Sequence, residues 1–147
     1  MLTAAERSRN YEKSMREKGF RKVHLWVPES RTDELARVAE GMRRKEEAEQ
    51  LRNFVLSTLR SMEHQLRAHG VVHLALFGSV ARYDASPDSD VDLVANLDVE
   101  KKLTILDLIT IEGMIAEKLG RNVDLVSRQG LNSRFRDSLS ADEISVF

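Results

Sequence analysis

The sequence lacks several features that would point to particular classes of protein. It contains no cysteine, which excludes disulfide bonds and thiolate metal sites and agrees with a reducing compartment. No apolar run approaches the length of a membrane span, and no segment is of low complexity. The first 19 residues are charged throughout and have no apolar centre, so they do not read as a secretory signal. These absences predict a cytoplasmic protein without a membrane partner.

The charge of the chain is unevenly distributed along its 147 residues. Residues 1–45 hold 12 Lys or Arg and 7 Asp or Glu, whereas residues 46–147 hold 11 and 17. Hydrophobic residues make up 41% of the chain and charged residues 32%, as in ordinary globular proteins. The basic first part is the candidate for a polyanion partner. From charge alone, a solvated helix rich in Lys and Arg is the simpler explanation.

The first part of the chain predicts a helix, a strand and a second helix. Residues 3–18 are polar with weak helical periodicity, and Gly19 is expected to end this helix. Residues 21–27 alternate between apolar and polar side chains, which predicts a strand with one apolar face. A helix is expected from about residue 30, and Gly41 is expected to end it.

The second part of the chain predicts a small mixed β-sheet flanked by helices, an α/β (α+β) fold. The expected order is helix 45–69, strand 71–77, strand 90–97, helix 101–119, strand 122–127 and helix 131–139, followed by a tail. On helix 101–119 the apolar face is expected to include Leu106, Thr110 and Met114. We therefore predict two domains, residues 1–45 and residues 46–147.

Three aspartates are the candidate metal ligands. Asp90 and Asp92 are two residues apart in a predicted strand, so their side chains point the same way. Two neighbouring carboxylates repel each other unless one takes up a proton or a cation lies between them. The sequence VDLV occurs at residues 91–94 and again at 123–126, which places Asp124 beside Asp92 if the two strands are neighbours in equivalent register. This oxygen-rich set predicts Mg²⁺ or Mn²⁺.

A Gly-Ser turn follows the predicted strand 71–77 and is the candidate phosphate-binding element. Gly78 permits a tight turn and a close approach of the backbone, and the N–H groups after it can bind phosphate oxygens together with the Ser79 hydroxyl. Arg82 follows one turn later and can neutralise a phosphate. A Gly-Ser turn or an Asp pair alone is weak evidence, but the combination is far more specific and predicts nucleotide transfer.

The stretch GSVARYDASPDSDVDLV resembles the minimal nucleotidyltransferase family of the polymerase-β superfamily, from about residue 50 to residue 147. The resemblance implies ATP or another nucleoside triphosphate as donor, with Gly78 and Ser79 on the triphosphate. It implies that Asp90, Asp92 and Asp124 bind metal, and that Asp124 also helps to deprotonate the acceptor hydroxyl. Tyr83 stands where the family often has glycine.

Members of this family resemble antitoxins that are paired with a HEPN-type RNase toxin. The resemblance implies that this chain is a protein adenylyltransferase, which silences a HEPN-type toxin by transferring AMP from ATP to a tyrosine hydroxyl. A hetero-oligomer with the toxin, or a homodimer, is then expected. Two alternatives remain open at this stage. One is a non-catalytic antitoxin that binds its toxin and represses DNA, and the other is an enzyme acting on a small molecule such as an aminoglycoside.

The stretch GFRKVHLWVPESR resembles the MazE-type antitoxin segment, and the order strand, helix, helix resembles the ribbon-helix-helix family. The strand has no partner nearby in sequence, and the same strand of a second copy would provide one. The resemblance implies that Arg21, Lys22, His24 and Trp26 contact operator DNA. Alternatively, the strand adds to an edge of the transferase sheet, or dimerises the chain without DNA. In the ribbon-helix-helix reading, helix 45–69 would have to serve both domains.

Overall fold

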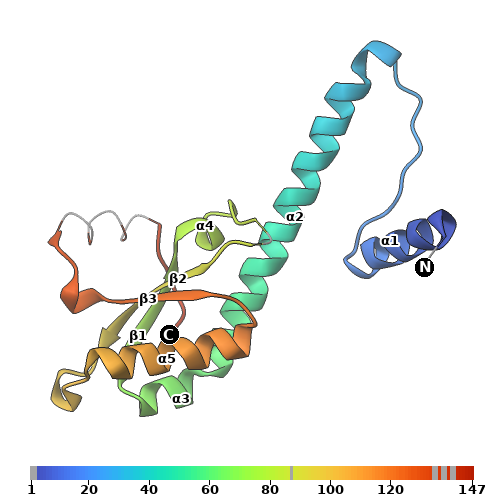
Figure 1. Ribbon diagram of the computed structural model, residues 1–147. Coiled ribbons are helices and arrows are strands. Elements are labelled where there is room, and N and C mark those ends of the chain that lie inside the picture. Colours follow the sequence, from blue (N-terminus) through green and yellow to red (C-terminus); the bar gives the residue numbers. More distant parts are fainter. Residues whose placement is uncertain (1–2, 87, 134–135, 137–138, 140–141) are drawn as a thin grey trace. The chain divides into compact units, whose positions relative to one another are not determined.

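The computed structural model describes residues 3–147 except residue 87 and residues 134–135, 137–138 and 140–141. The chain divides into two compact units, Met1–Arg37 and Val38–Phe147, which we describe separately (Figure 1). Among the described residues, none of the helices has both the length and the hydropathy that crossing a membrane requires.

The first unit contains the predicted N-terminal helix, α1, at Ala4–Glu17. Thr3 caps it through a reciprocal arrangement with Glu6, in which each side chain accepts a hydrogen bond from the other residue's backbone N–H. Gly19 follows the helix with φ +86°, as expected for a residue that ends a helix. No residue of α1 is buried, and most of its residues are exposed.

Residues 21–27 do not form the predicted strand, because the segment has no regular secondary structure in the single chain. A strand requires backbone partners, and no other strand of the described residues pairs with this segment. The side chains of Val23, Leu25 and Trp26 are therefore exposed. The Lys22 ammonium lies 2.6 Å from Glu12 of α1, which ties the segment back to that helix.

A short 3₁₀ turn at Glu29–Arg31 leads into helix α2, Thr32–Ser61. The prediction that Gly41 ends a helix is wrong, since α2 runs through it without interruption. Gly41 lacks the positive φ of a helix terminator, and the long, unbranched side chains around it favour helix. The chain instead breaks at Met62, before helix α3, Glu63–Ala68.

The second unit is built on a mixed four-stranded sheet in the order β3-β2-β1-β4. The strands are β1 (Val71–Phe77), β2 (Val91–Leu97), β3 (Val123–Ser127) and β4 (Ile144–Ser145). β1 is antiparallel to β2 and β4, and β2 is parallel to β3. Strand β4 lies where the sequence predicted a tail. It forms because Val146 is buried and its N–H donates to Leu74 of β1.

Helix α5, Ile105–Leu119, connects β2 to β3. It starts four residues later than predicted, because Thr104 and Asp107 cap it reciprocally, and Gly120 ends it in the left-handed conformation as expected. Its predicted apolar face is wrong. Ile111, Ile115 and Leu119 are buried in its place. The predicted helix 131–139 lies mostly outside the described residues.

The main hydrophobic core lies between the helices and one face of the sheet. Val55, Leu59 and Leu66, from the predicted apolar face of helix 45–69, pack there against Leu93 of β2 and Ile115 of α5. The opposite face has a smaller cluster around Ala75, Val94 and Leu139. Because side chains alternate along a strand, β2 buries Leu93 under the helices and presents Asp92 on the more open face.

Candidate active site

The candidate site begins at the end of β1, where the chain turns sharply at Gly78 into the short helix α4, Gly78–Ala81. Gly78 has φ +72°, which L side chains rarely adopt. A Cβ atom at this position would lie 2.0 Å from Oδ2 of Asp92, so only glycine allows the carboxylate to approach. The turn and Asp92 are therefore in direct contact.

The carboxylates of Asp92 and Asp124 project from paired positions of two neighbouring strands. The parallel register of β2 and β3 sets Asp92 opposite Asp124, as the repeated VDLV predicted. Burial raises the pKa of Asp92, and the negative charges of Asp124 and, more weakly, Asp90 raise it further. Arg82 opposes this shift. The paired strands thus set Asp92 beside Asp124, and Asp90 lies just before β2 begins. We call these three carboxylates the acidic site.

The acidic site is open and its charges are unpaired. None of the three carboxylates forms an ion pair or a hydrogen bond with another side chain in the part of the chain that the structure describes. Asp90 and Asp124 are exposed, and Asp92 is half-buried. The side chains do not yet converge: among the described residues, no group of three or more His, Asp or Glu is placed to hold a metal ion.

The predicted phosphate-binding residues lie next to these carboxylates. The Ser79 hydroxyl has no hydrogen-bond partner among the described residues, so it is available to a ligand. The Ser79 carbonyl accepts a hydrogen bond from Asp84 N–H at 2.9 Å, which closes the turn after α4. Arg82 is exposed and lies 3.4 Å from Asp84 and 3.7 Å from Asp142. A phosphate would have to compete with these two carboxylates for the Arg82 guanidinium.

The structure adds supporting residues that the sequence did not indicate. Arg52 of α2 stacks on the Tyr83 ring, with its guanidinium carbon 3.8 Å from the ring centroid, and its Nη1 donates to the Ala81 carbonyl. Tyr83 has φ +64°, an unfavourable value for a residue with a side chain, and this stack helps to hold it there. Arg121 donates to the Ser89 carbonyl, just before Asp90. All of these partners are distant in sequence, so no local pattern reveals them.

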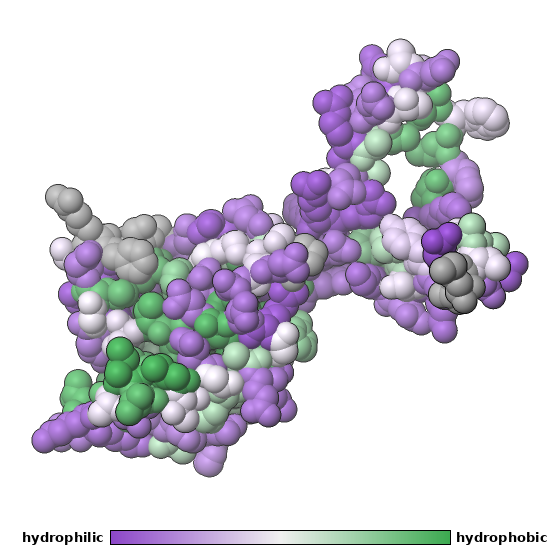
Figure 2. Space-filling model, in the orientation of Figure 1, coloured by the Kyte–Doolittle hydropathy of each residue, from purple (hydrophilic) through white to green (hydrophobic). Residues whose placement is uncertain are grey.

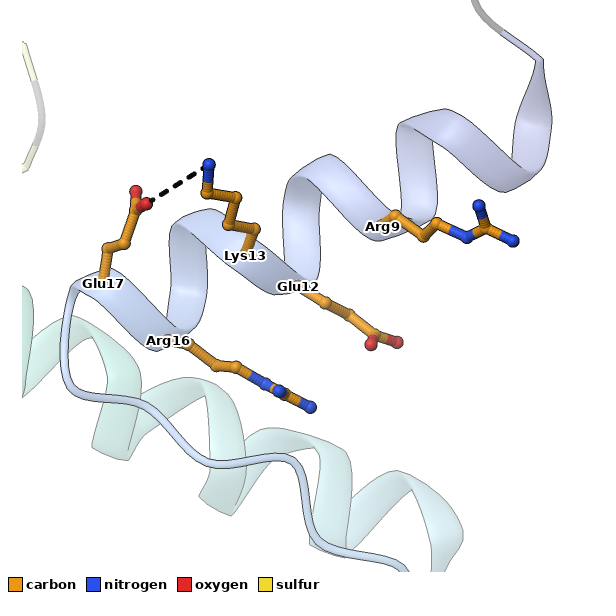
Figure 3. Close-up of a pocket in the computed structure, with 5 residues that line it drawn as sticks. All are labelled: Arg9, Glu12, Lys13, Arg16 and Glu17. Carbon is orange, nitrogen blue, oxygen red and sulfur yellow. Dashed lines mark ion pairs between the residues drawn. The ribbon is translucent and has the colours of Figure 1, made fainter.

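The predicted DNA contacts belong to the first unit. Arg21, Lys22, His24 and Trp26 are all exposed, and Lys22 is paired with Glu12. An open depression in the same unit is lined by α1 alone, through Arg9, Glu12, Lys13, Arg16 and Glu17 (Figure 3). Lys13 and Glu17 form an ion pair at 3.9 Å on one side of this helix. Mixed charges from one exposed helix do not enclose a substrate, so the depression adds nothing to the candidate site.

The nucleotidyltransferase domain family matches residues 58–145, more than half of the chain, and this segment includes the Gly-Ser turn and all three carboxylates. The chain belongs to the nucleotidyltransferase family. The predicted nucleotidyltransferase family, the fold class and the enzyme class are therefore confirmed, whereas the ribbon-helix-helix resemblance of the first part of the chain stays a prediction.

Relatives of this nucleotidyltransferase are similar to it over part of its length. The protein adenylyltransferase MntA of Thermococcus cleftensis is 37% identical over 97 residues, which cover 60% of this chain and 96% of MntA. The solved structure of a candidate minimal nucleotidyltransferase is 34% identical with a TM-score of 0.52, covering 66% of this chain and 93% of that one. The crystal structure of a toxin–antitoxin with AMP-PNP has a TM-score of 0.51 at 17% identity, covering 65% and 72%. The last likeness concerns the fold alone.

Proposed function

We propose that this nucleotidyltransferase transfers AMP from ATP to a tyrosine hydroxyl of a HEPN-type RNase toxin and thereby acts as its antitoxin. The observation that supports this most directly is the pairing of Asp92 with Asp124 beside Gly78. A phosphate-binding turn and a carboxylate site in direct contact are what phosphoryl and nucleotidyl transfer require. A relative at 37% identity is named a protein adenylyltransferase, and a neighbour in fold is a toxin–antitoxin with AMP-PNP.

A divalent cation fits the donor set of the site. Asp90, Asp92 and Asp124 offer only carboxylate oxygens, the ligands that Mg²⁺ and Mn²⁺ prefer. Their mutual repulsion, which raises the pKa of Asp92, is the kind that a bound cation relieves. When bound, Mg²⁺ supplies the positive charge that neutralises the phosphates during transfer. Asp90, Asp92 and Asp124 would hold the cation only after their side chains had moved closer together, because no group of three such residues is placed to hold a metal ion among the described residues.

The chain's own residues have distinct roles in this reaction. The backbone at Gly78 and the Ser79 hydroxyl hold the triphosphate, and Arg82 exchanges its carboxylate partners for a phosphate. Asp124, exposed at the open side, accepts the proton of the acceptor hydroxyl. The hydroxyl oxygen then forms a bond to the α-phosphorus, the bond between that phosphorus and the bridging oxygen breaks, and pyrophosphate leaves.

A transfer assay tests the activity. The chain is incubated with labelled ATP, Mg²⁺ and the toxin encoded by the adjacent gene, and we expect label on a toxin tyrosine. The double variant Asp90→Asn, Asp92→Asn should lose transfer while remaining folded, because removing clustered charges relieves repulsion. Asp88→Asn, also exposed but outside the predicted ligand set, serves as the matched control. Absence of transfer by the wild type, with Mg²⁺ binding intact, would refute the proposal.

A neutralisation assay separates catalysis from inhibition by binding alone. If the protein silences its toxin only by contact, the Asp90→Asn, Asp92→Asn variant should neutralise the toxin as well as the wild type does. If adenylylation is the mechanism, the variant should fail although it still binds the toxin in a pull-down.

We further propose that residues 1–45 bind operator DNA, with Arg21, Lys22, His24 and Trp26 as the contacts. The exposure of these side chains and the excess of Lys and Arg in this segment favour the idea. Promoter DNA should be retarded by the wild-type chain in a gel-shift assay. The variant Arg21→Ala, His24→Ala should bind several-fold more weakly, whereas Lys118→Ala on α5 should bind as the wild type does. Equal binding by all three proteins would exclude the assignment.

A further inference from the structure

Helix α5 has an exposed apolar face in addition to the face that it buries. Ile111, Ile115 and Leu119 pack into the core, whereas Ile105 is 74% exposed, Leu106 70% and Ile109 57%. Figure 2 shows the corresponding hydrophobic patch on the surface of the second unit. Three large aliphatic side chains together on one exposed helix face are more than the single exposed residues that folding leaves on most surfaces.

The apolar face continues along α5 with small residues. Leu106, Ile109, Gly113 and Ala116 follow one another at spacings of three, four and three, the a and d positions of a heptad. A Cβ atom on Gly113 would meet nothing within 4 Å, so the fold of the single chain does not require glycine there. Glycine in a helix interior is less favourable for helix formation than alanine. The large residues Leu106 and Ile109 and the small residues Gly113 and Ala116 lie along one continuous strip of the helix surface, which we call the seam.

The order of sizes makes this seam complementary to itself. In an antiparallel helix pair, each a position packs against a d position of the other helix. With α5 of a second copy in the reverse direction, Leu106 lies opposite Ala116 and Ile109 lies opposite Gly113. Large side chains then fill the spaces above small ones at every layer, which is how packed helices reach interior density. A parallel pair would instead set large against large and leave a void at Gly113.

We propose that α5 pairs with α5 of a second copy of this chain, antiparallel and across a two-fold axis, through the seam Leu106, Ile109, Gly113 and Ala116. Such a two-fold contact uses the same surface on both copies, as the self-complementary seam requires. The active site would remain accessible, because α5 covers the sheet face opposite to Asp92 and Asp124. This dimer is independent of any pairing through residues 21–27.

The expected dimer is weak, because one helix pair buries less area than the ~1,200 Å² at which stable interfaces begin. Sedimentation velocity of the full chain from about 10 to 500 µM should therefore show association over this range. Ile109→Asp should raise the dissociation constant more than about a hundredfold, since each copy would bury a charge in an apolar seam. Leu25→Asp, in the first unit, should leave association unchanged. A monomeric wild type, or association lost in Leu25→Asp and kept in Ile109→Asp, would overturn the proposal.

A size exchange tests the register. Ile109→Ala should weaken the dimer by removing the large residue, and Gly113→Leu should weaken it by filling the space. The double variant carries both changes in each copy, so a large side chain at one position again faces a small side chain at the other across the two-fold axis. Its dissociation constant should therefore return to within about threefold of the wild-type value. Circular dichroism checks that each variant is folded. A double variant that is folded but no more associated than either single variant would contradict this register.

Crosslinking provides a second test, which the absence of cysteine in the chain makes clean. Ile109→Cys mixed with Gly113→Cys should form a mixed disulfide dimer under mild oxidation, because these positions face each other across the seam. Ile109→Cys mixed with Lys118→Cys, which lies on another side of α5, should not do so at a comparable rate. Equal rates of disulfide formation in both mixtures would mean that the chains collide at random, which would contradict the proposal. If Ile109→Cys were protected from thiol labelling only when a HEPN-type toxin is added, the seam would bind that toxin instead of a second copy.

Discussion

Gly78 has no Cβ atom, and this absence allows both the positive φ of its backbone and the close approach of the Asp92 carboxylate. We predict that Gly78→Ala reduces transfer by about a hundredfold or more, because the new methyl group would lie 2.0 Å from Oδ2 of Asp92. That oxygen is the far end of a half-buried side chain, so Asp92 moves and the fold survives. The positive φ adds a loss of about 1–2 kcal/mol in the free energy of unfolding.

Gly120→Ala is the matched control for this prediction. Gly120 also has a positive φ, +65°, but a Cβ atom there would meet nothing within 4 Å. It should lose a similar amount of stability in urea unfolding and keep its transfer rate. If both variants lost activity equally, backbone strain rather than contact with Asp92 would be responsible.

The raised pKa of Asp92 predicts a pH dependence of stability in the metal-free protein. The folded state binds the Asp92 proton more tightly than the unfolded state, so the free energy of unfolding should fall as the pH rises from the ordinary aspartate pKa through the raised one. Asp92→Asn lacks this charge and should be more stable at pH 7, by at most about 1 kcal/mol given solvent screening. Urea unfolding in EDTA between about pH 3.5 and 7 measures the difference. A variant that is less stable at pH 7 would contradict it.

The sequence predicted much of the site because its geometry follows from short-range rules. The repeated VDLV predicted the register that sets Asp92 beside Asp124, which the sheet confirms. The predicted strand 90–97 begins one residue later, at Val91, so Asp90 precedes it. Whether these aspartates ligate metal stays a prediction. The stack of Arg52 on Tyr83 could not be predicted, since it joins residues of different elements through packing.

At the scale of elements, α2 provides a test of what glycine does within a helix. Gly41 lies inside α2 without a positive φ, and a Cβ atom there would meet nothing within 4 Å. Gly41→Ala should therefore increase helix content and stabilise α2 by about 1 kcal/mol, as measured by circular dichroism during thermal unfolding. Gly70→Ala is expected to destabilise the protein, because Gly70 has φ +94° and Leu103 would lie 2.8 Å from the new atom. If Gly41→Ala destabilised the protein instead, the result would support the sequence-based prediction that a helix ends at Gly41.

Three parts of the fold differ from prediction because partners distant in sequence decide them. β4 is two residues long and pairs with β1, some 70 positions earlier in the chain, so no local pattern could reveal it. On α5 both faces are apolar, and periodicity alone did not identify the one that packs on the sheet. The segment 21–27 has the alternation of a strand but no partner strand among the described residues. Alternating apolar and polar side chains favour a strand, but a strand forms only when its backbone pairs with another strand.

At the scale of the whole molecule, every described core residue lies between Ala48 and Val146. A fragment of residues 46–147 therefore loses no buried side chain, and it contains the whole segment that the nucleotidyltransferase domain family matches, residues 58–145. We predict that this fragment folds, that its unfolding midpoint lies within about 5 °C of the full chain, and that it keeps most of the transfer activity. Calorimetry and the labelled-ATP assay measure these, with the full chain carrying Arg21→Ala, His24→Ala as the control. A fragment that is folded but inactive would mean that residues 1–45 contribute to the transfer reaction itself.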